Sequence, residues 1–219
     1  MKTLSKEMQA AITPSMALDL LKEGNKRFVN NLKVNRNLLQ QANETSDGQH
    51  PFAVILSCID SRTSAELIFD QGLGDIFSVR IAGNIINEDI LGSMEFGCKV
   101  AGSKIILVLG HTKCGAVKGA CDNVELGNLT ALLTKIRPAV EDEKTTKENR
   151  NANNSEFVEK VATLNVKRTV KSIKEQSPII KDLIESGQIG IVGGIHDITT
   201  GKVTFYPETI DFGSQMKNV

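Results

Sequence analysis

Two cysteines and one histidine in this sequence have the residue types and spacing of a metal site. Cys58 opens the pentapeptide CIDSR, and His111 and Cys114 are the two ends of the tetrapeptide HTKC. Two thiolates and one imidazole form a known ligand set for Zn²⁺, and three protein ligands leave a tetrahedral ion one open position for water. The sequence therefore predicts a catalytic rather than a structural site, with one zinc ion per subunit.

Two charged residues, Asp60 and Arg62, follow Cys58 at intervals of two residues. In an extended segment, side chains two residues apart project to the same side of the backbone. We therefore expect both charges to lie beside the open position of the metal. An ordinary ion pair at the end of a strand is the alternative interpretation of the same spacing.

The sequence contains four cysteines, and two of them lie outside these motifs. We expect Cys98 and Cys121 to be core thiols, because free cysteine is often fully buried. The same interpretation is the alternative for Cys58 and Cys114. Four irregularly spaced cysteines without an export signal do not predict a disulfide framework.

Aliphatic runs and amphipathic segments alternate along the chain. Four runs rich in aliphatic and β-branched residues predict buried strands over 52–57, 76–82, 104–110 and 189–195. Segments of helical period cover 64–71, 88–101, 114–122 and a long stretch, 155–186, that Pro178 interrupts. This order is typical of an α/β fold, with a mostly parallel sheet of four to five strands flanked by helices.

The predicted metal ligands stand where two of these strands end. Cys58 follows the run 52–57, and His111 follows the run 104–110. Ligands of open parallel sheets bind beyond the carboxyl ends of the strands, so we expect the fold to bring these distant residues together. Cys114 begins a predicted helix, where unpaired amides and the helix dipole lower the pKa of a thiol.

The length and the pattern indicate a single domain over residues 1–219. We divide it into an N-terminal helical arm, 1–45, and an α/β core, 46–219. Residues 14–31 have apolar side chains near one helical face but no strand of their own to cover, so we expect the arm to pack elsewhere. The polar stretch 142–154 is expected to be a solvated loop or a fraying helix end.

The charges balance, with 26 Lys and Arg residues against 26 Asp and Glu residues. A chain without a strong net field favours a small or neutral partner over nucleic acid or an anionic membrane. The N-terminus lacks the apolar core of a signal peptide, and no stretch approaches the ~20 apolar residues that span a bilayer. We expect a cytoplasmic protein.

The paired motifs C-x-D-S-R and H-x-x-C resemble those of the β-carbonic anhydrases. The resemblance extends to LLKEGNKRFVNN, VRIAGN and DITTGKV, and so covers most of the chain. It implies reversible hydration of carbon dioxide to bicarbonate and a proton by zinc-bound hydroxide. In this mechanism Asp60 accepts a hydrogen bond from the hydroxide and Arg62 keeps Asp60 ionised. If Arg62 releases Asp60, the carboxylate closes the site as a fourth ligand.

The resemblance also implies a substrate-binding side of the cleft, formed by Gln49, Phe77, Ala82, Phe96 and Gly115. Gln49 is typical of the plant-like subgroup, although a GQHP turn is an alternative role for it. The bicarbonate-regulated subgroup uses a tryptophan that this chain lacks. The family further implies a homodimer, or a higher assembly such as a tetramer, with the N-terminal arm laid over the partner.

Two alternatives to carbonic anhydrase activity stay open at this point. The same scaffold could hydrolyse carbon disulfide or carbonyl sulfide, or the chain could be a non-catalytic zinc or regulatory protein. His50 and His196 are candidates for a proton relay, but each has an ordinary surface or hydrogen-bonded role as its alternative. Because two thiolates neutralise the charge of the dication, we expect the activity to rise into the alkaline range.

Overall fold

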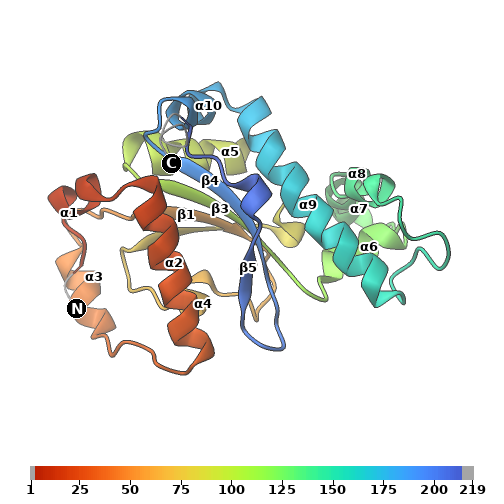
Figure 1. The fold of residues 1–219 in the computed structure, drawn as a ribbon, viewed down its shortest axis with the longest axis horizontal. Helices are drawn as coiled ribbons and strands as arrows, with labels where there is room; N and C mark the ends of the chain where they lie inside the picture. Colours follow the sequence, from red (N-terminus) through yellow and green to blue (C-terminus); the bar gives the residue numbers. More distant parts are fainter. Residues whose placement is uncertain (1–2, 214–219) are drawn as a thin grey trace.

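The computed structural model describes residues 3–213, and a five-stranded sheet forms its centre (Figure 1). The strand order is β2-β1-β3-β4-β5. The first four strands are parallel to one another, and β5 is antiparallel to β4. The strands are β1 (Ala53–Ser57), β2 (Ile76–Arg80), β3 (Ile105–His111), β4 (Gly190–His196) and β5 (Val203–Phe205). The four predicted strands and the α/β fold class are confirmed.

Alternating side chains of the central strands enter two different cores. Val54 and Leu56 of β1 pack on one face of the sheet, while Ala53 and Ile55 pack on the other. All five residues of β1 and all seven of β3 are buried. This explains why both strands read as continuous apolar runs, which is the pattern of parallel strands covered on both faces.

Three helices cover the first face of the sheet: α5 (Glu88–Glu95), α9 (Ser155–Gln176) and α10 (Pro178–Glu185). The predicted break at Pro178 is confirmed, because α9 ends there and Pro178 is the first residue of α10. The hydroxyl of Ser177 caps the new helix by accepting a hydrogen bond from the Ile180 amide. The predicted helix 88–101 is shorter than expected, because a π-helical turn, Phe96–Val100, follows α5.

The second face of the sheet is covered by α2 (Pro14–Val29) and the short helix α4 (Ala65–Ile68), as Figure 1 shows for α2. Ala17, Leu18 and Leu21 of α2 are at most 2% exposed and belong to the core on this face. The expectation that this segment packs away from the sheet is therefore wrong for α2. The helices α1 (Lys6–Ala11) and α3 (Leu38–Glu44) complete the N-terminal region.

A buried carboxylate, Asp70, fastens the N-terminal region to the core. Its Oδ2 accepts a hydrogen bond from Arg27 Nε at 2.6 Å, and its Oδ1 accepts one from Arg36 Nη1 at 2.5 Å. Arg36 also donates to the backbone oxygen of Asp70 through Nη2 at 2.5 Å. These bonds join residues on both sides of the predicted boundary at residue 45.

A third apolar cluster lies under α6 (Gly115–Cys121), α7 (Gly127–Thr134) and α8 (Arg137–Asp142). The stretch after α8 is mostly exposed, as expected for a solvated loop, but it encloses one buried acid, Glu143, which is only 2% exposed. Arg150 donates to Glu143 Oε2 at 2.8 Å and stacks on the Phe157 ring. A polar sequence here encodes an ordered loop, because its buried acid has partners inside the loop itself.

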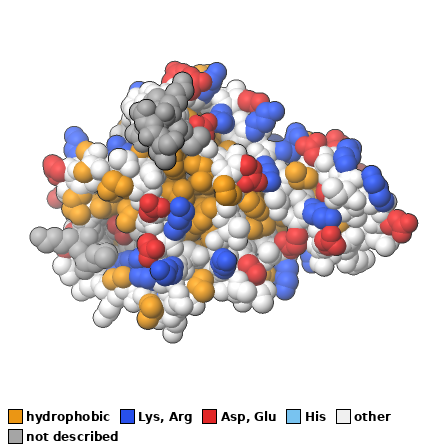
Figure 2. All heavy atoms as spheres, viewed as in Figure 1, with side chains coloured by type: hydrophobic (Ala, Val, Ile, Leu, Met, Phe, Trp, Pro, Cys, Tyr) orange, Lys and Arg blue, Asp and Glu red, His pale blue; other side chains and the backbone are white. Residues whose placement is uncertain are grey.

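Among the described residues, no helix is both long and apolar enough to cross a membrane. On the face shown in Figure 2, hydrophobic side chains gather near the middle, and acidic and basic side chains are interspersed around them. The described residues on this face therefore form no continuous basic surface, in line with the balanced charges of the sequence.

Candidate metal centre

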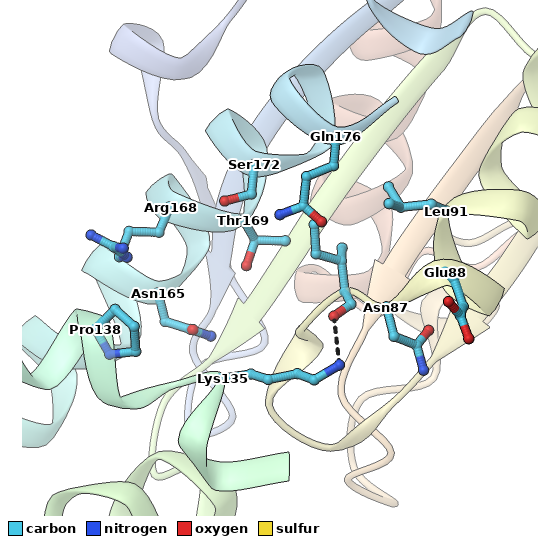
Figure 3. A pocket seen from close by; sticks show the side chains of 11 residues that line it. Asn87, Glu88, Leu91, Lys135, Pro138, Asn165, Arg168, Thr169, Ser172 and Gln176 are labelled. Atoms are coloured by element: carbon cyan, nitrogen blue, oxygen red, sulfur yellow. Dashed lines mark hydrogen bonds between the residues drawn. The ribbon is translucent and has the colours of Figure 1, made fainter. Parts of the chain in front are cut away.

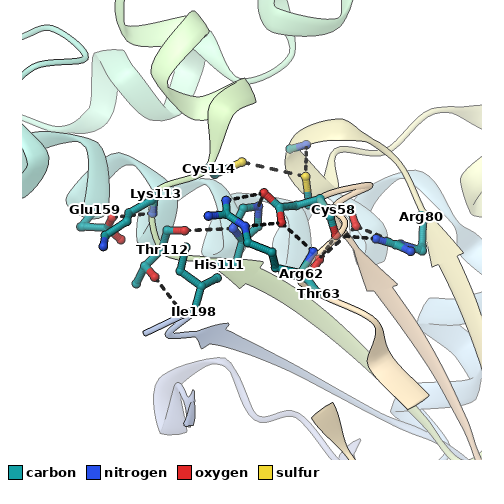
Figure 4. A network of polar contacts seen from close by, with 12 residues as sticks. Cys58, Arg62, Thr63, Arg80, His111, Thr112, Lys113, Cys114, Glu159 and Ile198 are labelled. Carbon is teal, nitrogen blue, oxygen red and sulfur yellow. Dashed lines mark hydrogen bonds and ion pairs between the residues drawn. The ribbon is translucent and has the colours of Figure 1, made fainter. Parts of the chain in front are cut away.

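The three predicted ligands meet at the carboxyl end of the sheet (Figure 4). Cys58 directly follows β1, His111 is the last residue of β3, and Cys114 is the residue before α6. Because β1 and β3 are parallel neighbours, the two strands end at the same edge. The ligand atoms of the three residues lie within 4.8 Å of one another, which confirms that the fold assembles them.

The observed geometry fits a zinc ion. The sulfur atoms of Cys58 and Cys114 are 4.0 Å apart, and two thiolates on one tetrahedral zinc ion at ~2.3 Å each would be about 3.8 Å apart. His111 is 1% exposed, and its Nε2 has no hydrogen-bond partner among the described residues. Its Nδ1 lies 2.9 Å from the carbonyl oxygen of Thr112, so Nδ1 carries the proton and Nε2 the lone pair.

The electrostatics of the two thiols favour a cation between them. A hydrogen bond from the Cys114 thiol holds the pKa of Cys58 well below its usual range, and the Gly83 amide contributes by donating to Cys58 Sγ at 3.3 Å. The resulting thiolate, together with burial, raises the pKa of Cys114. Without a metal ion the pair thus favours a single negative charge, whereas a dication favours two thiolates.

Asp60 and Arg62 form a bidentate ion pair beside the three ligands. Arg62 Nε donates to Asp60 Oδ1 at 2.9 Å and Arg62 Nη2 donates to Oδ2 at 2.7 Å. The hydrogen bonds from Arg62 hold the pKa of Asp60 well below its ordinary value. Oδ2 is 4.0 Å from His111 Nε2, so the carboxylate borders the ligand set while Arg62 engages both of its oxygens.

Side-chain donors that bind backbone carbonyls hold the loop that begins at Cys58. Arg80, the last residue of β2, donates to the carbonyl oxygen of Cys58 at 3.0 Å and to that of Asp60 at 2.7 Å. The Thr63 hydroxyl donates to the Asp60 carbonyl at 2.9 Å. The sequence interpretation missed Arg80, whose signal is weak because it recognises backbone atoms rather than a motif.

The turn Ala82–Asn84, which carries the Gly83 amide, is supported from behind by α9. Asn165 Nδ2 donates to the Gly83 carbonyl at 2.8 Å, and the Thr169 hydroxyl lies 3.4 Å from the Asn84 carbonyl. Both side chains line a hollow of about 700 Å³ between α5, α8 and α9, where Lys135 donates to the Ile86 carbonyl at 3.4 Å (Figure 3).

The residues predicted to bind substrate fall into two groups. Ala82 is the first residue of the turn whose Gly83 contacts Cys58, and Gly115 is the first residue of α6, next to Cys114. Phe77 on the edge strand β2 and Phe96 form an edge-to-face pair with ring centroids 6.2 Å apart, and Phe96 is 53% exposed. This pair lies along the sheet edge rather than among the ligands.

Gln49 is exposed and precedes the amino end of β1, whereas Cys58 follows its carboxyl end. The five residues of the strand alone separate these ends by about 17 Å. The structure therefore does not bring Gln49 to the ligands of its own chain.

Two histidines were predicted as candidates for proton transfer. His196 pairs with His111 in the register of β3 and β4 and is 3% exposed. Burial, together with the nearby His111, lowers the pKa of His196 to about 4. His50 is half-buried next to Gln49, before β1, and thus at the end of the sheet away from the ligands.

Comparisons with known proteins agree with this geometry. A family model described as Carbonic anhydrase matches residues 53–203. Carbonic anhydrase 2 of Mycobacterium tuberculosis is 34% identical over 210 residues, which cover 93% of this chain and 98% of that protein. The solved β-carbonic anhydrase CafA of Aspergillus fumigatus has a TM-score of 0.69 at 27% identity, with 88% of this chain and 90% of that chain covered.

The fold is also similar to that of a solved tetrameric β-carbonic anhydrase from Sordaria macrospora. Its TM-score is 0.68 at 22% identity, and the match covers 88% of this chain and 95% of that chain. The chain therefore belongs to the β-carbonic anhydrase family of zinc enzymes, and its Cys58, His111 and Cys114 fit the zinc site.

Proposed function

We propose that this carbonic anhydrase interconverts carbon dioxide and bicarbonate with Asp60 and Arg62 as its catalytic residues. The observation that carries the proposal is the ion pair of these residues at the border of the Cys58, His111 and Cys114 ligand set. Bound zinc would supply the reaction with a nucleophile by acidifying a water molecule at moderate pH.

Asp60 is suited to accept a hydrogen bond and to orient the attacking oxygen toward carbon dioxide. Arg62 lowers its pKa, so the carboxylate remains an acceptor throughout the working pH range. The two parallel hydrogen bonds also fix the plane of the carboxylate. Because Arg62 occupies both oxygens, we propose that the site is open, with Asp60 outside the ligand set.

The decisive experiment is stopped-flow carbon dioxide hydration by Asp60→Asn at measured zinc content. We expect kcat/KM to fall about 10–100-fold, as for the loss of an orienting group next to a metal ligand. Asp19→Asn is the matched control, because Asp19 is an exposed acid on α2. Full activity of Asp60→Asn would favour a non-catalytic zinc protein, and faster turnover of carbonyl sulfide or carbon disulfide would favour a hydrolase.

We further propose a homodimer that forms along the edge strand β2. Unpaired edge strands are natural sites of association, and an apolar pair, Phe77 and Phe96, lies beside this one. A two-fold axis between antiparallel β2 edges brings the amino end of one sheet to the carboxyl end of the other. Gln49, which precedes β1, would then serve the metal centre of the partner together with the Phe77–Phe96 pair.

Phe96→Asp tests this arrangement, because a buried unpaired carboxylate at the interface would oppose association. We expect light scattering to show monomers that retain zinc but lose most of their activity. Leu126→Asp is the control, since Leu126 is 67% exposed and precedes α7, far along the chain from β2. A fully active Phe96→Asp monomer would contradict the shared site. Assembly into tetramers, a cytoplasmic location and the plant-like subgroup stay predictions.

A further inference from the structure

A carboxylate outside the family motifs, Glu159 of α9, contacts the loop between two metal ligands. Its Oε1 accepts a hydrogen bond from the backbone amide of Lys113 at 2.8 Å (Figure 4). Lys113 has a φ of 58°, a left-handed conformation that lysine rarely adopts without support from its surroundings. The contact joins α9 to the tetrapeptide HTKC.

The peptide group that Glu159 binds also contacts His111. The amide of Lys113 and the carbonyl of Thr112 belong to the same peptide unit, and that carbonyl accepts the Nδ1 proton of His111 at 2.9 Å. A continuous chain therefore runs from the carboxylate through the peptide group to the imidazole (Figure 4). The remaining nitrogen of the ring, Nε2, has no hydrogen-bond partner among the described residues and is the atom available to zinc.

We propose that Glu159 is a positioning residue that strengthens His111 as a zinc ligand through the Thr112–Lys113 peptide group. Hydrogen bonds in a chain polarise one another, so a carboxylate at the amide makes the carbonyl a stronger acceptor. A stronger acceptor at Nδ1 makes the imidazole more basic at Nε2, as a carboxylate bound directly to a zinc histidine does. This role of the Glu159 carboxylate rests on the proposed function, because it requires zinc at His111.

The loop has other anchors that do not depend on Glu159. The amide of Thr112 donates to the carbonyl of His196 at 3.0 Å, and the hydroxyl of Thr112 accepts a hydrogen bond from the Ile198 amide at 3.1 Å. Both contacts come from the end of β4 and the residues after it. The loop should therefore keep its course when Glu159 is neutralised, so that the effect of the charge can be measured separately.

Several charged residues surround Glu159. It lines a hollow of about 500 Å³ together with Asp142, Glu143, Lys144, Glu156 and Lys160. Tyr206 also lies within electrostatic reach and bonds to Thr163 of the same helix at 3.0 Å. Glu156 provides a matched control, because it is an exposed glutamate of the same helix whose ion pair with Lys160, at 2.7 Å, does not involve the loop.

The test compares Glu159→Gln, Glu159→Ala and Glu156→Gln in the full-length protein. Zinc affinity is measured by competition with a chelator, and the Nδ1 proton of His111 is followed by NMR in the zinc-free and zinc-loaded protein. We expect Glu159→Gln to weaken zinc binding about 3–10-fold, less than the 10–100-fold typical of direct partners of a ligand. The Nδ1 proton resonance should move upfield, and the pH midpoint of carbon dioxide hydration should fall because a poorer donor leaves the metal more electrophilic.

Glu159→Ala should show the same changes or larger ones, and Glu156→Gln should show none. Wild-type zinc affinity and an unmoved Nδ1 resonance in Glu159→Gln would overturn the proposal, even if Glu159→Ala lost its metal. A wild-type protein that binds no zinc at this site would instead refute the proposed function itself, so the two failures are distinguishable.

Discussion

Gly83 is the position at which one added methyl group tests the geometry of the metal centre most directly. Its φ is +70°, and its amide donates to Cys58 Sγ at 3.3 Å. A Cβ atom at this position would lie 2.5 Å from Cδ1 of Ile136 and 3.3 Å from Cβ of Ala116. Gly83→Ala therefore combines an unfavourable backbone conformation with overpacking.

The expected magnitude follows from these two terms. The left-handed conformation costs an alanine about 1–2 kcal/mol, and overpacking in a well-filled core costs about 1–3 kcal/mol. Ile136 is fully buried, so its methyl group has little room to move aside. We expect Gly83→Ala to lower the free energy of unfolding by about 2–5 kcal/mol, and to weaken zinc binding because the shifted turn no longer presents its amide to Cys58.

Urea unfolding at fixed protein and zinc concentrations measures the change through the transition midpoint. Gly92→Ala is the matched control, because Gly92 lies in α5 and a Cβ atom there meets no atom of residues 3–213 within 4 Å. That variant should be more stable by about 0.5–1 kcal/mol, since alanine is the better helix former. A free energy of unfolding for Gly83→Ala within 1 kcal/mol of wild type, with unchanged zinc affinity, would refute the reasoning.

Two further predictions concern the ion pairs of Asp70 with Arg27 and Arg36 and the free cysteines. Burial opposes ionisation of Asp70, but the hydrogen bonds from two arginines outweigh burial and lower the pKa of Asp70. The ionised carboxylate therefore stabilises the fold above the unfolded pKa of ~3.9, and this stabilisation is lost as the pH falls through the folded pKa. Asp70→Asn should therefore lower the free energy of unfolding by about 3–5 kcal/mol at pH 7. In denaturant titrations, the difference in this free energy between the variant and wild type should shrink below pH ~4. A difference that stays the same at low pH would contradict the ion-pair explanation. Chelation should lower the thermal midpoint and make Cys58, the ligand cysteine whose pKa is lowered, reactive toward iodoacetamide. Peptide mapping should find Cys98 and Cys121 unmodified while the protein stays folded, because burial raises their pKa values to about 12 and about 11.

The sequence predicted the parts of the structure that depend on short-range patterns. The aliphatic runs located four strands, and the placement of Cys58 and His111 after two of them located the metal centre. By contrast, α7 and α8 were not predicted. Neither has a side-chain cap at its first residue, and helices of six to eight residues depend on tertiary packing rather than on their own propensity.

The N-terminal region shows a different limit of sequence patterns. The apolar face of α2 was recognised, but an amphipathic helix has the same pattern whether it packs on its own sheet or on another subunit. The structure places Leu18 and Leu21 against β-strand residues of the same chain. Whether this helix packs on its own sheet depends on a contact between distant segments, and no local feature of residues 14–31 predicts that contact.

In the metal centre, a sequence motif shows the ligands but not the residues that support them. The ligands are side chains, whereas the supporting residues bind backbone atoms. Arg80 binds the carbonyl of Cys58, Gly83 presents its amide to the sulfur, and Glu159 binds the amide of Lys113. The side chain of the residue whose backbone is bound, such as Lys113, takes no part in the contact, so a motif cannot record it. These supports come from β2, the turn after it and α9, which argues that the ligands are held in place by the fold before a metal ion arrives.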